Sequence, residues 1–319
     1  MTSLNLGENE IAFPGLGIDK LTVKSEAFSV FGISIAWYGV IIATGMLLAI
    51  IFCNTQMKKY GLHPDRVFDV IIGGIIGGVV GARTYFVLMN WEEYADDIKS
   101  VFMIRNGGLA IYGGIIGAVL VGAVVAKIKK VKMLPLLDLA GMGFLIGQGI
   151  GRWGNFFNHE AFGYNTDLPW GMTSGRIQNW IIQHNSSISS SSDIIEMTAD
   201  KPVHPCFLYE SIWCLLGFVV LFIISKHRKF DGQIFLTYVL WYGIGRSVIE
   251  GLRTDSLMFG NIRVSQLLAI VSSITALILL LVIGSKVKRM GEDYTLYVNT
   301  EESKKLMEET EASLTTKKK

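Results

Sequence analysis

The sequence has few charged residues and little proline, histidine or cysteine. Only 18% of its 319 residues are Asp, Glu, Lys or Arg, whereas about 25% is usual in soluble globular proteins. The formal net charge is +2, and such a balance argues against a nucleic-acid binder, which needs clustered basic side chains. The cysteine count is three, without a Cys-x-x-Cys pair, which excludes a disulfide scaffold. Half of the residues are hydrophobic and the mean hydropathy is +0.43, so the composition indicates a membrane protein.

Apolar runs that are long enough to cross a bilayer recur along the chain. A helix needs about 20 mostly apolar residues to span the hydrocarbon core. The first thirty residues lack a basic leader with a cleavage site behind it, so we expect no cleaved signal peptide. The fourth run is the weakest, because Pro135, Asp138, Gln148 and several glycines interrupt it. We predict an all-α membrane protein with seven transmembrane helices, at 31–53, 67–89, 109–126, 133–151, 206–225, 233–251 and 264–284.

Basic residues mark alternate connecting segments. The links after the first, third and fifth spans and the segment after the last are rich in Lys and Arg, and the other links are poorer in them. Because cytoplasmic loops are enriched in these residues, we predict an N-terminus outside and a cytoplasmic C-terminus. Residues 1–285 then form a seven-helix transmembrane domain, with an extracytoplasmic head at about 158–204 that contains a flexible stretch from Ser186 to Asp193. Residues 286–319 form a charged cytoplasmic tail, helical around 301–310.

Glycines repeat every four residues in the second and third spans. Gly73, Gly77 and Gly81 lie on one face of the second span, and Gly113 and Gly117 do the same on the third. Small residues at this spacing let helix backbones approach closely in lipid. We predict that these faces serve helix packing.

Ionisable side chains lie near the outer ends of several spans. They are Arg83, Arg152, Arg246 and Glu250, with Arg253 just beyond the sixth span. An arginine at a helix centre costs about 2.5–3.5 kcal/mol on insertion scales, so such residues usually face a partner or a cavity. Arg246 and Glu250, four residues apart, could simply neutralise each other. The four arginines together predict an anion site in the outer half of the bilayer, such as a phospholipid phosphate.

A glycine-rich motif begins at the end of the fourth span and continues beyond it. Residues 147–163 read GQGIGRWGNFFNHEAFG, and without a preceding strand the motif does not indicate a dinucleotide site. The motif resembles the signature of the prolipoprotein diacylglyceryl transferase family. Further matching motifs follow in the family's order over about residues 30–285: Trp37-Tyr38-Gly39, Gly81-Ala82-Arg83, GGLAIYGG at 107–114, DLPWG at 167–171, HPCFLYE at 204–210 and Tyr242 to Arg253.

The resemblance implies an enzyme of the bacterial cytoplasmic (inner) membrane whose active site faces the extracytoplasmic side. The reaction moves a diacylglyceryl group from phosphatidylglycerol to the lipobox cysteine of a prolipoprotein signal peptide, forming a thioether and releasing glycerol phosphate. This is the first step of bacterial lipoprotein maturation. No metal or organic cofactor and no nucleic acid is implied; the expected partners are phosphatidylglycerol, prolipoprotein signal peptides and membrane lipids. The alternative function classes are a seven-helix receptor and a transporter, and these would share only the helix topology with this sequence, not the motifs.

This reaction needs fixed positive charge for the leaving phosphate and a thiolate as nucleophile. We predict Arg152 and Arg246 as the phosphate clamp, with Glu250 positioning Arg246. Tyr112 stands where many family members carry histidine and is the candidate base; alternatively, the arginines acidify the thiol directly. His204 is a weaker candidate for the base, the alternative being that it caps the start of the fifth span, and the cysteines (Cys53, Cys206, Cys214) are expected to be apolar packing residues. The predicted phosphatidylglycerol-binding residues are Arg152, Asn155, Glu160, Arg83, Tyr38, Gly163, Tyr242, Arg253 and His204.

Overall fold

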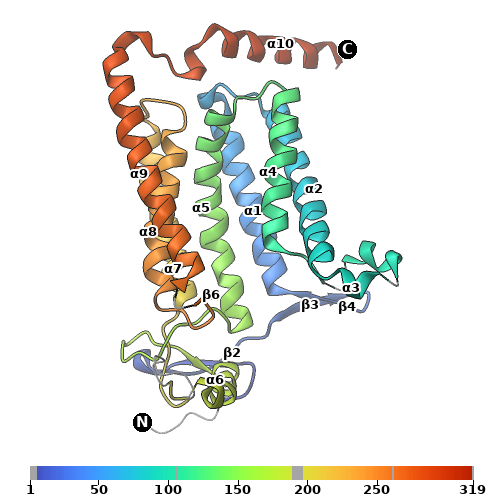
Figure 1. Cartoon of the computed structure of the whole chain (residues 1–319), viewed down its shortest axis with the longest axis vertical. Helices are drawn as coiled ribbons and strands as arrows, with labels where there is room; N and C mark the ends of the chain where they lie inside the picture. Colours follow the sequence, from blue (N-terminus) through green and yellow to red (C-terminus); the bar gives the residue numbers. More distant parts are fainter. Residues whose placement is uncertain (1–5, 96, 105–106, 189–196, 261, 318–319) are drawn as a thin grey trace. The chain divides into compact units, whose positions relative to one another are not determined.

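The chain is mostly helical, as the hydropathy pattern predicts. A computed structural model describes residues 6–95, 97–104, 107–188, 197–260 and 262–317, so most of the predicted flexible stretch from Ser186 to Asp193 lies outside the described residues. One long helix occupies each predicted span: α1 (Trp37–Gln56), α2 (Pro64–Met89), α4 (Ile111–Ile128), α5 (Met133–Asn158), α7 (Cys206–Ser225), α8 (Gln233–Glu250) and α9 (Val264–Met290) (Figure 1).

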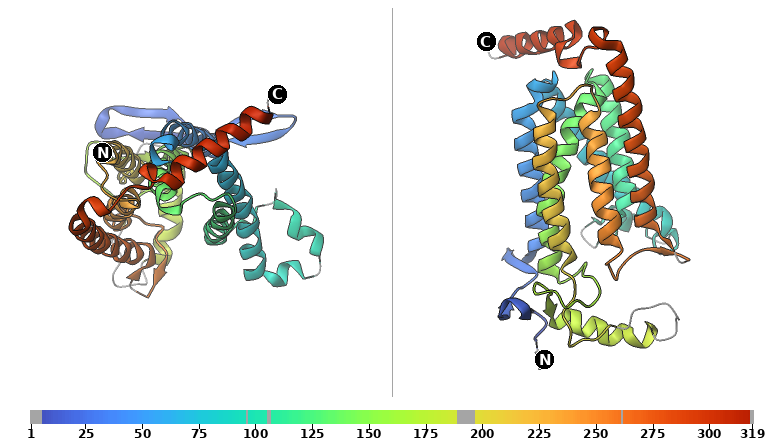
Figure 2. Two further views of the ribbon diagram at one scale, coloured as in Figure 1. Left: turned by 90° about the horizontal axis from the view of Figure 1, so that it is seen from above. Right: turned by 90° about the vertical axis from the view of Figure 1, so that its left-hand side faces the viewer.

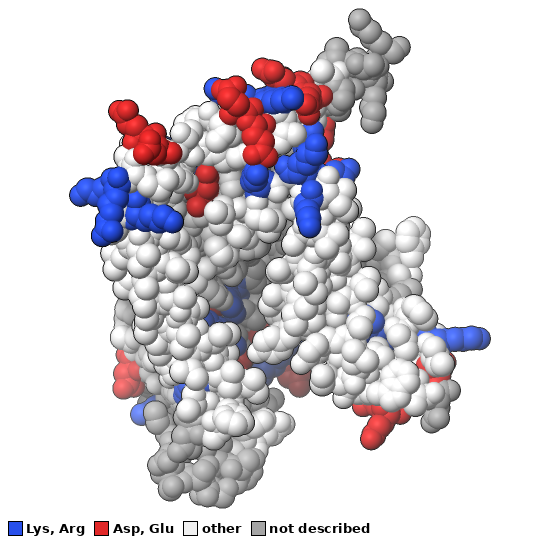
Figure 3. Space-filling model, turned by 45° about the horizontal axis from the view of Figure 1, so that its top comes forward, with Lys and Arg blue, Asp and Glu red and all other residues white. Residues whose placement is uncertain are grey.

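The long helices have the composition of membrane spans. Within the described ranges, six helices are long and apolar enough to cross a membrane. Of the seven long helices, α8 is the one that is not apolar enough by this measure, because its 18 residues include Gln233, Arg246 and Glu250. On the face shown in Figure 3, the sides of the helices are largely uncharged, and Lys, Arg, Asp and Glu side chains gather near helix ends. The chain is therefore an integral membrane protein, and the count of seven spans stays a prediction.

The first predicted span begins too early. Its first residues belong to a β-hairpin of β3 (Glu26–Val30) and β4 (Ile33–Ala36), and α1 starts only at Trp37. Phe31 and Gly32 form the turn, with φ of 50° and 78°. Hydrophobicity alone does not distinguish a short apolar strand from the start of a helix, and the β-branched residues beside this turn favour a strand.

Two compact units make up the chain. The first contains α7, α8, α9, most of α1 and the C-terminal part of α5, whereas the second contains α2, α4 and the N-terminal part of α5. Unit 1 comprises Met1–Cys53, Ala140–Lys229 and Gln233–Gly291, and unit 2 comprises Asn54–Leu139, Phe230–Gly232 and Glu292–Lys319.

A small head in unit 1 is built from the N-terminal strands and the segment after α5. Strand β1 (Glu10–Phe13) lies between β2 (Ile18–Thr22) and β5 (Thr173–Ser174) in an antiparallel sheet, and α6 (Gly175–Ile188) follows β5. The buried core of the head also takes side chains from the end of α5 and the start of α7, which anchors it to these two helices. Its members are Ile11, Val23, Phe156, Phe162, Met172, Ile177, Ile181, Met197, Val203 and Phe207.

Helices α7, α8 and α9 run side by side in unit 1 (Figures 1 and 2). Between α7 and α8, the rings of Trp213 and Trp241 stack with centroids 4.5 Å apart. Each indole Nε1 donates to the other residue's carbonyl oxygen, at 2.9 and 3.0 Å. Each ring also lies over a glycine of the facing helix, Gly217 or Gly245, where a Cβ would collide with the indole nitrogen. This reciprocal contact fixes the register of α7 against α8.

The predicted glycine faces pack α2 against α4 in unit 2. A Cβ at Gly81 would collide with the carbonyl oxygen of Gly113, and a Cβ at Gly117 would collide with that of Gly77. The two backbones therefore approach as closely as glycine permits. The prediction of a packing role for these glycines is confirmed.

The C-terminal segment of unit 2 is folded. Helix α10 (Glu301–Lys317) confirms the helix expected around 301–310. Ser303 Oγ donates to the carbonyl oxygen of Gly61 at 3.1 Å, and Glu302 pairs with Lys132 at 3.0 Å. The remaining short helical elements are η1 (Pro14–Leu16), η2 (Met57–Tyr60), α3 (Trp91–Tyr94), η3 (Ile98–Phe102), η5 (Gly291–Asp293) and η6 (Tyr297–Asn299).

Candidate active site

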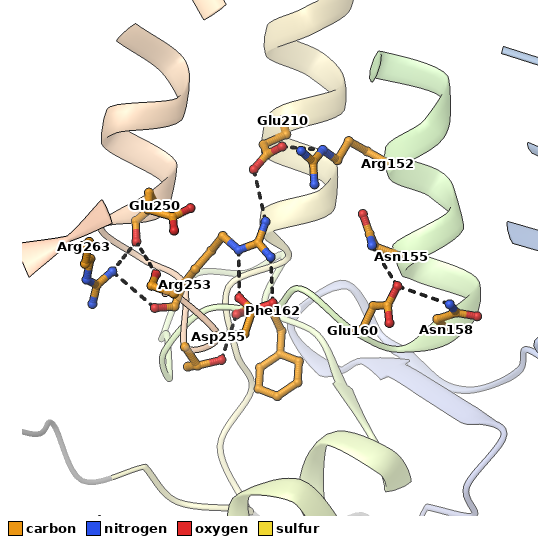
Figure 4. Close-up of polar contacts among 12 residues, drawn as sticks. Arg152, Asn155, Asn158, Glu160, Phe162, Glu210, Glu250, Arg253, Asp255 and Arg263 are labelled. Atoms are coloured by element: carbon orange, nitrogen blue, oxygen red, sulfur yellow. Dashed lines mark hydrogen bonds and ion pairs between the residues drawn. The ribbon is translucent and has the colours of Figure 1, made fainter. Parts of the chain in front are cut away.

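Glu210 lies at the centre of a cluster of ionised side chains in unit 1. It is near the start of α7, and its side chain is only 4% exposed. Its carboxylate forms an ion pair with Arg152 Nε from α5, shown in Figure 4. Its Oε1 atom also lies 2.6 Å from Arg246 Nη1 and 3.6 Å from Arg253 Nη1. Guanidinium groups from three separate segments therefore share one buried carboxylate.

A second buried carboxylate, that of Glu250, holds the other side of Arg246. Arg246 Nη2 lies 2.6 Å from Glu250 Oε2, and the Glu250 side chain is 2% exposed. The four-residue spacing on α8 places both side chains on one helix face. The ion pair between Arg246 and Glu250, which the sequence leaves open as an alternative, is present. Glu210 contacts the same Arg246 guanidinium group.

Arg253 lies in the turn after α8 and is held by Asp255. Its Nε and Nη2 atoms donate to the two carboxylate oxygens at 2.8 and 2.7 Å. Burial alone would raise the pKa of Asp255, but the hydrogen bonds and charge of Arg253 outweigh it and keep that pKa below its usual range. Burial alone would likewise lower the pKa of Arg253, and Asp255, followed by Glu210 and Glu250, raises it instead. Both groups therefore stay ionised.

The backbone of Gly163 fixes the turn that carries Arg253. These two residues form an antiparallel bridge, and Gly163 N donates to the carbonyl oxygen of His204 at 2.9 Å. A Cβ at Gly163 would lie 2.7 Å from the carbonyl oxygen of Leu252 and 2.9 Å from His204 Cβ. Only glycine fits here without displacing the backbone. Gly163 thus joins the head to the turn after α8.

Asn155, Asn158 and Glu160 form a second polar group where α5 ends. Both asparagine amides donate to Glu160 Oε1, at 2.9 and 3.2 Å (Figure 4). Glu160 N also donates to the carbonyl oxygen of Asn155 at 3.0 Å. Arg152, one turn earlier, is oriented by Glu210, and the Asn155 amide is oriented by Glu160.

The two predicted tyrosines of unit 1 pack their rings against other helical residues. Tyr38, near the start of α1, packs its ring on Gly154 of α5, where a Cβ would lie 2.6 Å from the ring. Its side chain remains partly open, and the residue is 37% exposed. Tyr242 stacks on Tyr238 one turn away on α8, with centroids 5.9 Å apart.

His204 does not cap α7. The N-cap residue of this helix is Pro205, so the predicted alternative of a histidine cap is wrong. His204 Nδ1 instead lies 3.1 Å from the hydroxyl of Tyr209, and burial lowers the pKa of the imidazole. The backbone of His204 pairs with the Gly163–Tyr164 segment of the head.

Arg83 and Tyr112 belong to unit 2. Arg83 is buried, and it donates to the carbonyl oxygens of Ser100, Val101, Gly107 and Gly108 at 2.7 to 2.9 Å. Its guanidinium group therefore holds the segment that precedes α4. Tyr112 is the second residue of α4 and is 51% exposed. The structure brings Arg152, Arg246, Arg253 and Glu250 together within unit 1.

Glu210 and Asp255 are not among the site residues predicted from the sequence. Glu210 stands in the HPCFLYE motif at the start of an apolar span. An ionisable side chain in such a span indicates a functional site, and this holds for the carboxylate of Glu210 as it does for the arginines. The three cysteines are buried, as expected of packing residues. In the part of the chain that the structure describes, no group of three or more His, Cys, Asp or Glu side chains could hold a metal ion.

Comparison with known proteins identifies the family. A family model described as prolipoprotein diacylglyceryl transferase matches residues 25–282. The chain belongs to the prolipoprotein diacylglyceryl transferase family. The match covers α1 through most of α9 and contains Arg152, Glu210, Arg246 and Arg253.

Similar proteins from several bacteria carry the name phosphatidylglycerol–prolipoprotein diacylglyceryl transferase. The protein of Clostridioides difficile is 41% identical over 252 residues, which cover 79% of this chain and 92% of that protein. The Enterococcus faecalis protein is 39% identical over 288 residues, covering 89% and 97%. The Staphylococcus haemolyticus protein is 42% identical over 260 residues, covering 81% and 88%. The similarity therefore extends over nearly the full length of these relatives.

Proposed function

We propose that this chain transfers the diacylglyceryl group of phosphatidylglycerol to the cysteine thiol of a prolipoprotein. The observation that carries the proposal is the family match over residues 25–282, which contains the whole arginine cluster around Glu210. A transferase of this kind needs no prosthetic group, because the reaction exchanges one bond to carbon for another. Arginine suits the task, since it is permanently charged and matches phosphate oxygens with paired donors.

The chemistry assigns different tasks to the clustered residues. The sulfur attacks the glyceryl carbon, the C–S bond forms, the C–O bond to phosphate breaks, and the bonding electrons leave with glycerol phosphate. We assign stabilisation of this leaving anion to Arg152 and Arg246, since fixed positive charge in a water-poor site stabilises developing negative charge most strongly. Glu210 and Glu250 hold the two guanidinium groups in place before the lipid binds.

Asn155 and Glu160 offer hydrogen-bonding groups to the glycerol hydroxyls of the headgroup. Their side chains are already joined to each other and to Asn158, so the amide and the carboxylate have defined orientations. Tyr38, Tyr242, Gly163, Arg253, Arg83 and His204 complete the proposed lipid-binding set.

The thiol proton must leave before or during the attack, because the thiolate is the nucleophile. We propose Tyr112 as its acceptor; the alternative is that the positive field of the arginines lowers the pKa of the incoming thiol. Replacement of the Tyr112 hydroxyl separates these two routes, because only the first route loses turnover.

We further propose seven membrane spans, an extracytoplasmic N-terminus and an active site facing outward in the bacterial cytoplasmic membrane. The alternation of basic loops supports this orientation. A lipobox cysteine is then reached from the outer side. A reporter fused after Lys319 is expected to behave as cytoplasmic, and an extracytoplasmic signal would contradict the topology.

The direct test incubates membranes that contain the chain with phosphatidylglycerol and a synthetic lipobox peptide. The expected result is a peptide mass increased by one diacylglyceryl group. Arg152→Lys or Arg246→Lys should reduce product formation far more than Cys53→Ala or Cys214→Ala, which are the matched controls. An unmodified peptide in the presence of folded, unsubstituted protein would refute the proposed function.

A further inference from the structure

Arg263 lies outside the ion-pair cluster, yet it contacts the backbone of two cluster members. It is the last residue of strand β7 (Ile262–Arg263), which pairs with β6 (Met258–Phe259) in the hairpin between α8 and α9. It is also the N-cap residue of α9. Figure 4 shows its guanidinium group directed at the turn that carries Glu250 and Arg253.

The contacts of Arg263 are made with carbonyl oxygens and one hydroxyl. Nη1 donates to the carbonyl oxygen of Glu250 and, at 3.3 Å, to that of Arg253. Nη2 donates to the hydroxyl of Tyr164 at 3.0 Å, and the guanidinium carbon lies 5.9 Å from the centroid of the same ring. Among the described residues, Arg263 forms no ion pair with a carboxylate.

These acceptors lie at the C-terminal end of α8, where the carbonyl oxygen of Glu250 also accepts from Arg253 N at 3.3 Å and from Ser256 Oγ at 3.4 Å. Glu250 is the final residue of α8, and the last carbonyl oxygens of a helix have no partner within the helix. A cation at this end is also favoured by the helix dipole. Arg263 therefore fixes where α8 ends and in which direction the chain continues to Arg253.

Both residues held in this way send their side chains into the cluster. Glu250 pairs with Arg246, and Arg253 lies 3.6 Å from Glu210. The contact with Tyr164 ties the same point to the head, since Tyr164 N donates to the carbonyl oxygen of Leu252 at 3.0 Å. A shift of the α8 terminus would thus displace Glu250 from its pair with Arg246 and Arg253 from its contact with Glu210.

We propose that Arg263 is a positioning residue of the transferase, which holds the backbone of Glu250 and Arg253 so that their side chains meet Arg246 and Glu210. It acts through these residues and does not itself contact the lipid. The proposal rests on the proposed function. Because misplacement of reacting groups by about 1 Å can cost two orders of magnitude in rate, loss of this contact should be visible in turnover.

The test compares Arg263→Met, Arg263→Lys and Tyr164→Phe in the lipobox-peptide assay with varied phosphatidylglycerol. Loss of hydrogen bonds from a charged donor predicts a fall of about tenfold in kcat/KM for Arg263→Met, with part of the activity restored in Arg263→Lys. Tyr164→Phe keeps the aromatic ring and should show a smaller loss. Arg289→Met, at the exposed opposite end of α9, is the matched control and should keep full activity.

A double-mutant cycle separates positioning from a purely structural role. If Arg263 acts through Glu250, then Arg263→Met should cost little further activity in a Glu250→Gln background. Full activity of Arg263→Met, or losses that simply add in the double variant, would overturn the proposal. If Arg263→Met does not fold, Arg263→Lys and Tyr164→Phe replace it in the same double-mutant cycle with Glu250→Gln. An inactive unsubstituted protein would refute the proposed function instead, so the two failures are distinguishable.

Discussion

Glu210→Gln changes the centre of the arginine cluster while keeping the shape of the side chain. The carboxylate is 4% exposed and contacts Arg152, Arg246 and Arg253. Removing one partner from a buried ion pair typically costs about 3–5 kcal/mol, because the remaining charges lose their compensation. We expect a loss of this order in the free energy of unfolding, since three guanidinium groups would then repel one another in a site of low exposure.

The same substitution should impair catalysis more than its effect on folding explains. Without the carboxylate, Arg152 and Arg246 lose the contact that orients them before the lipid binds, and a fall of about a hundredfold in kcat/KM is expected from misplaced groups. The assay measures lipobox-peptide modification at varied phosphatidylglycerol, with thermal unfolding in detergent followed by tryptophan fluorescence.

Glu302→Gln provides the matched control for this substitution. The Glu302 side chain is 53% exposed and pairs with Lys132. Exposed pairs of this kind contribute about 1 kcal/mol or less, so both activity and unfolding should stay close to those of the unsubstituted chain. A Glu210→Gln variant with unchanged turnover and unchanged unfolding would refute the reasoning about the shared carboxylate.

Three further outcomes follow from individual contacts. Gly245→Ala should lower stability by more than the few tenths of a kcal/mol usual for a surface change, because the added methyl group meets the Trp213 indole; unfolding in detergent measures this. Tyr112→Phe should lose turnover at unchanged lipid affinity, and full turnover would assign proton removal to the arginine field. Burial lowers the pKa of His159 below its ordinary value of 6.5, so the folded state favours the neutral ring. Stability should therefore fall as the pH drops below that value, and His159→Gln should flatten this dependence; an unchanged pH profile of unfolding would contradict it.

Much of the helical fold could be predicted from hydropathy and spacing. Each predicted span contains a long helix, and the glycine repeats of α2 and α4 do meet each other. The head could not be predicted in this way. Its strands are short, and β5 joins β1 across a large part of the sequence, so no local period reveals the pairing. The start of α1 was misplaced for a related reason, because the apolar residues of β4 resemble the start of a span.

The candidate site could be predicted only in part. Arg152, Arg246, Glu250 and Arg253 stand out because charge is rare in apolar spans, and the structure gathers them in unit 1. The carboxylate that joins them was missed, since Glu210 and Arg246 are 36 positions apart and the contact depends on the register of α7 against α8. That register is set by the reciprocal Trp213 and Trp241 contacts, which the sequence alone does not display.

Arg83 has contacts that its position in the sequence does not reveal. Its place near the end of a span predicts an anion ligand, but its donors are used by carbonyl oxygens of the segment before α4. A buried arginine can satisfy a loop backbone as well as a phosphate, because both present oxygen acceptors. Sequence position does not distinguish these two environments.

An experimental structure of the chain with bound phosphatidylglycerol tests the central claim most directly. The account predicts that the lipid phosphate lies within hydrogen-bond distance of the guanidinium groups of Arg152 and Arg246, with Glu210 still in contact with both. A phosphate bound elsewhere, with these two arginines engaged only by Glu210 and Glu250, would contradict it.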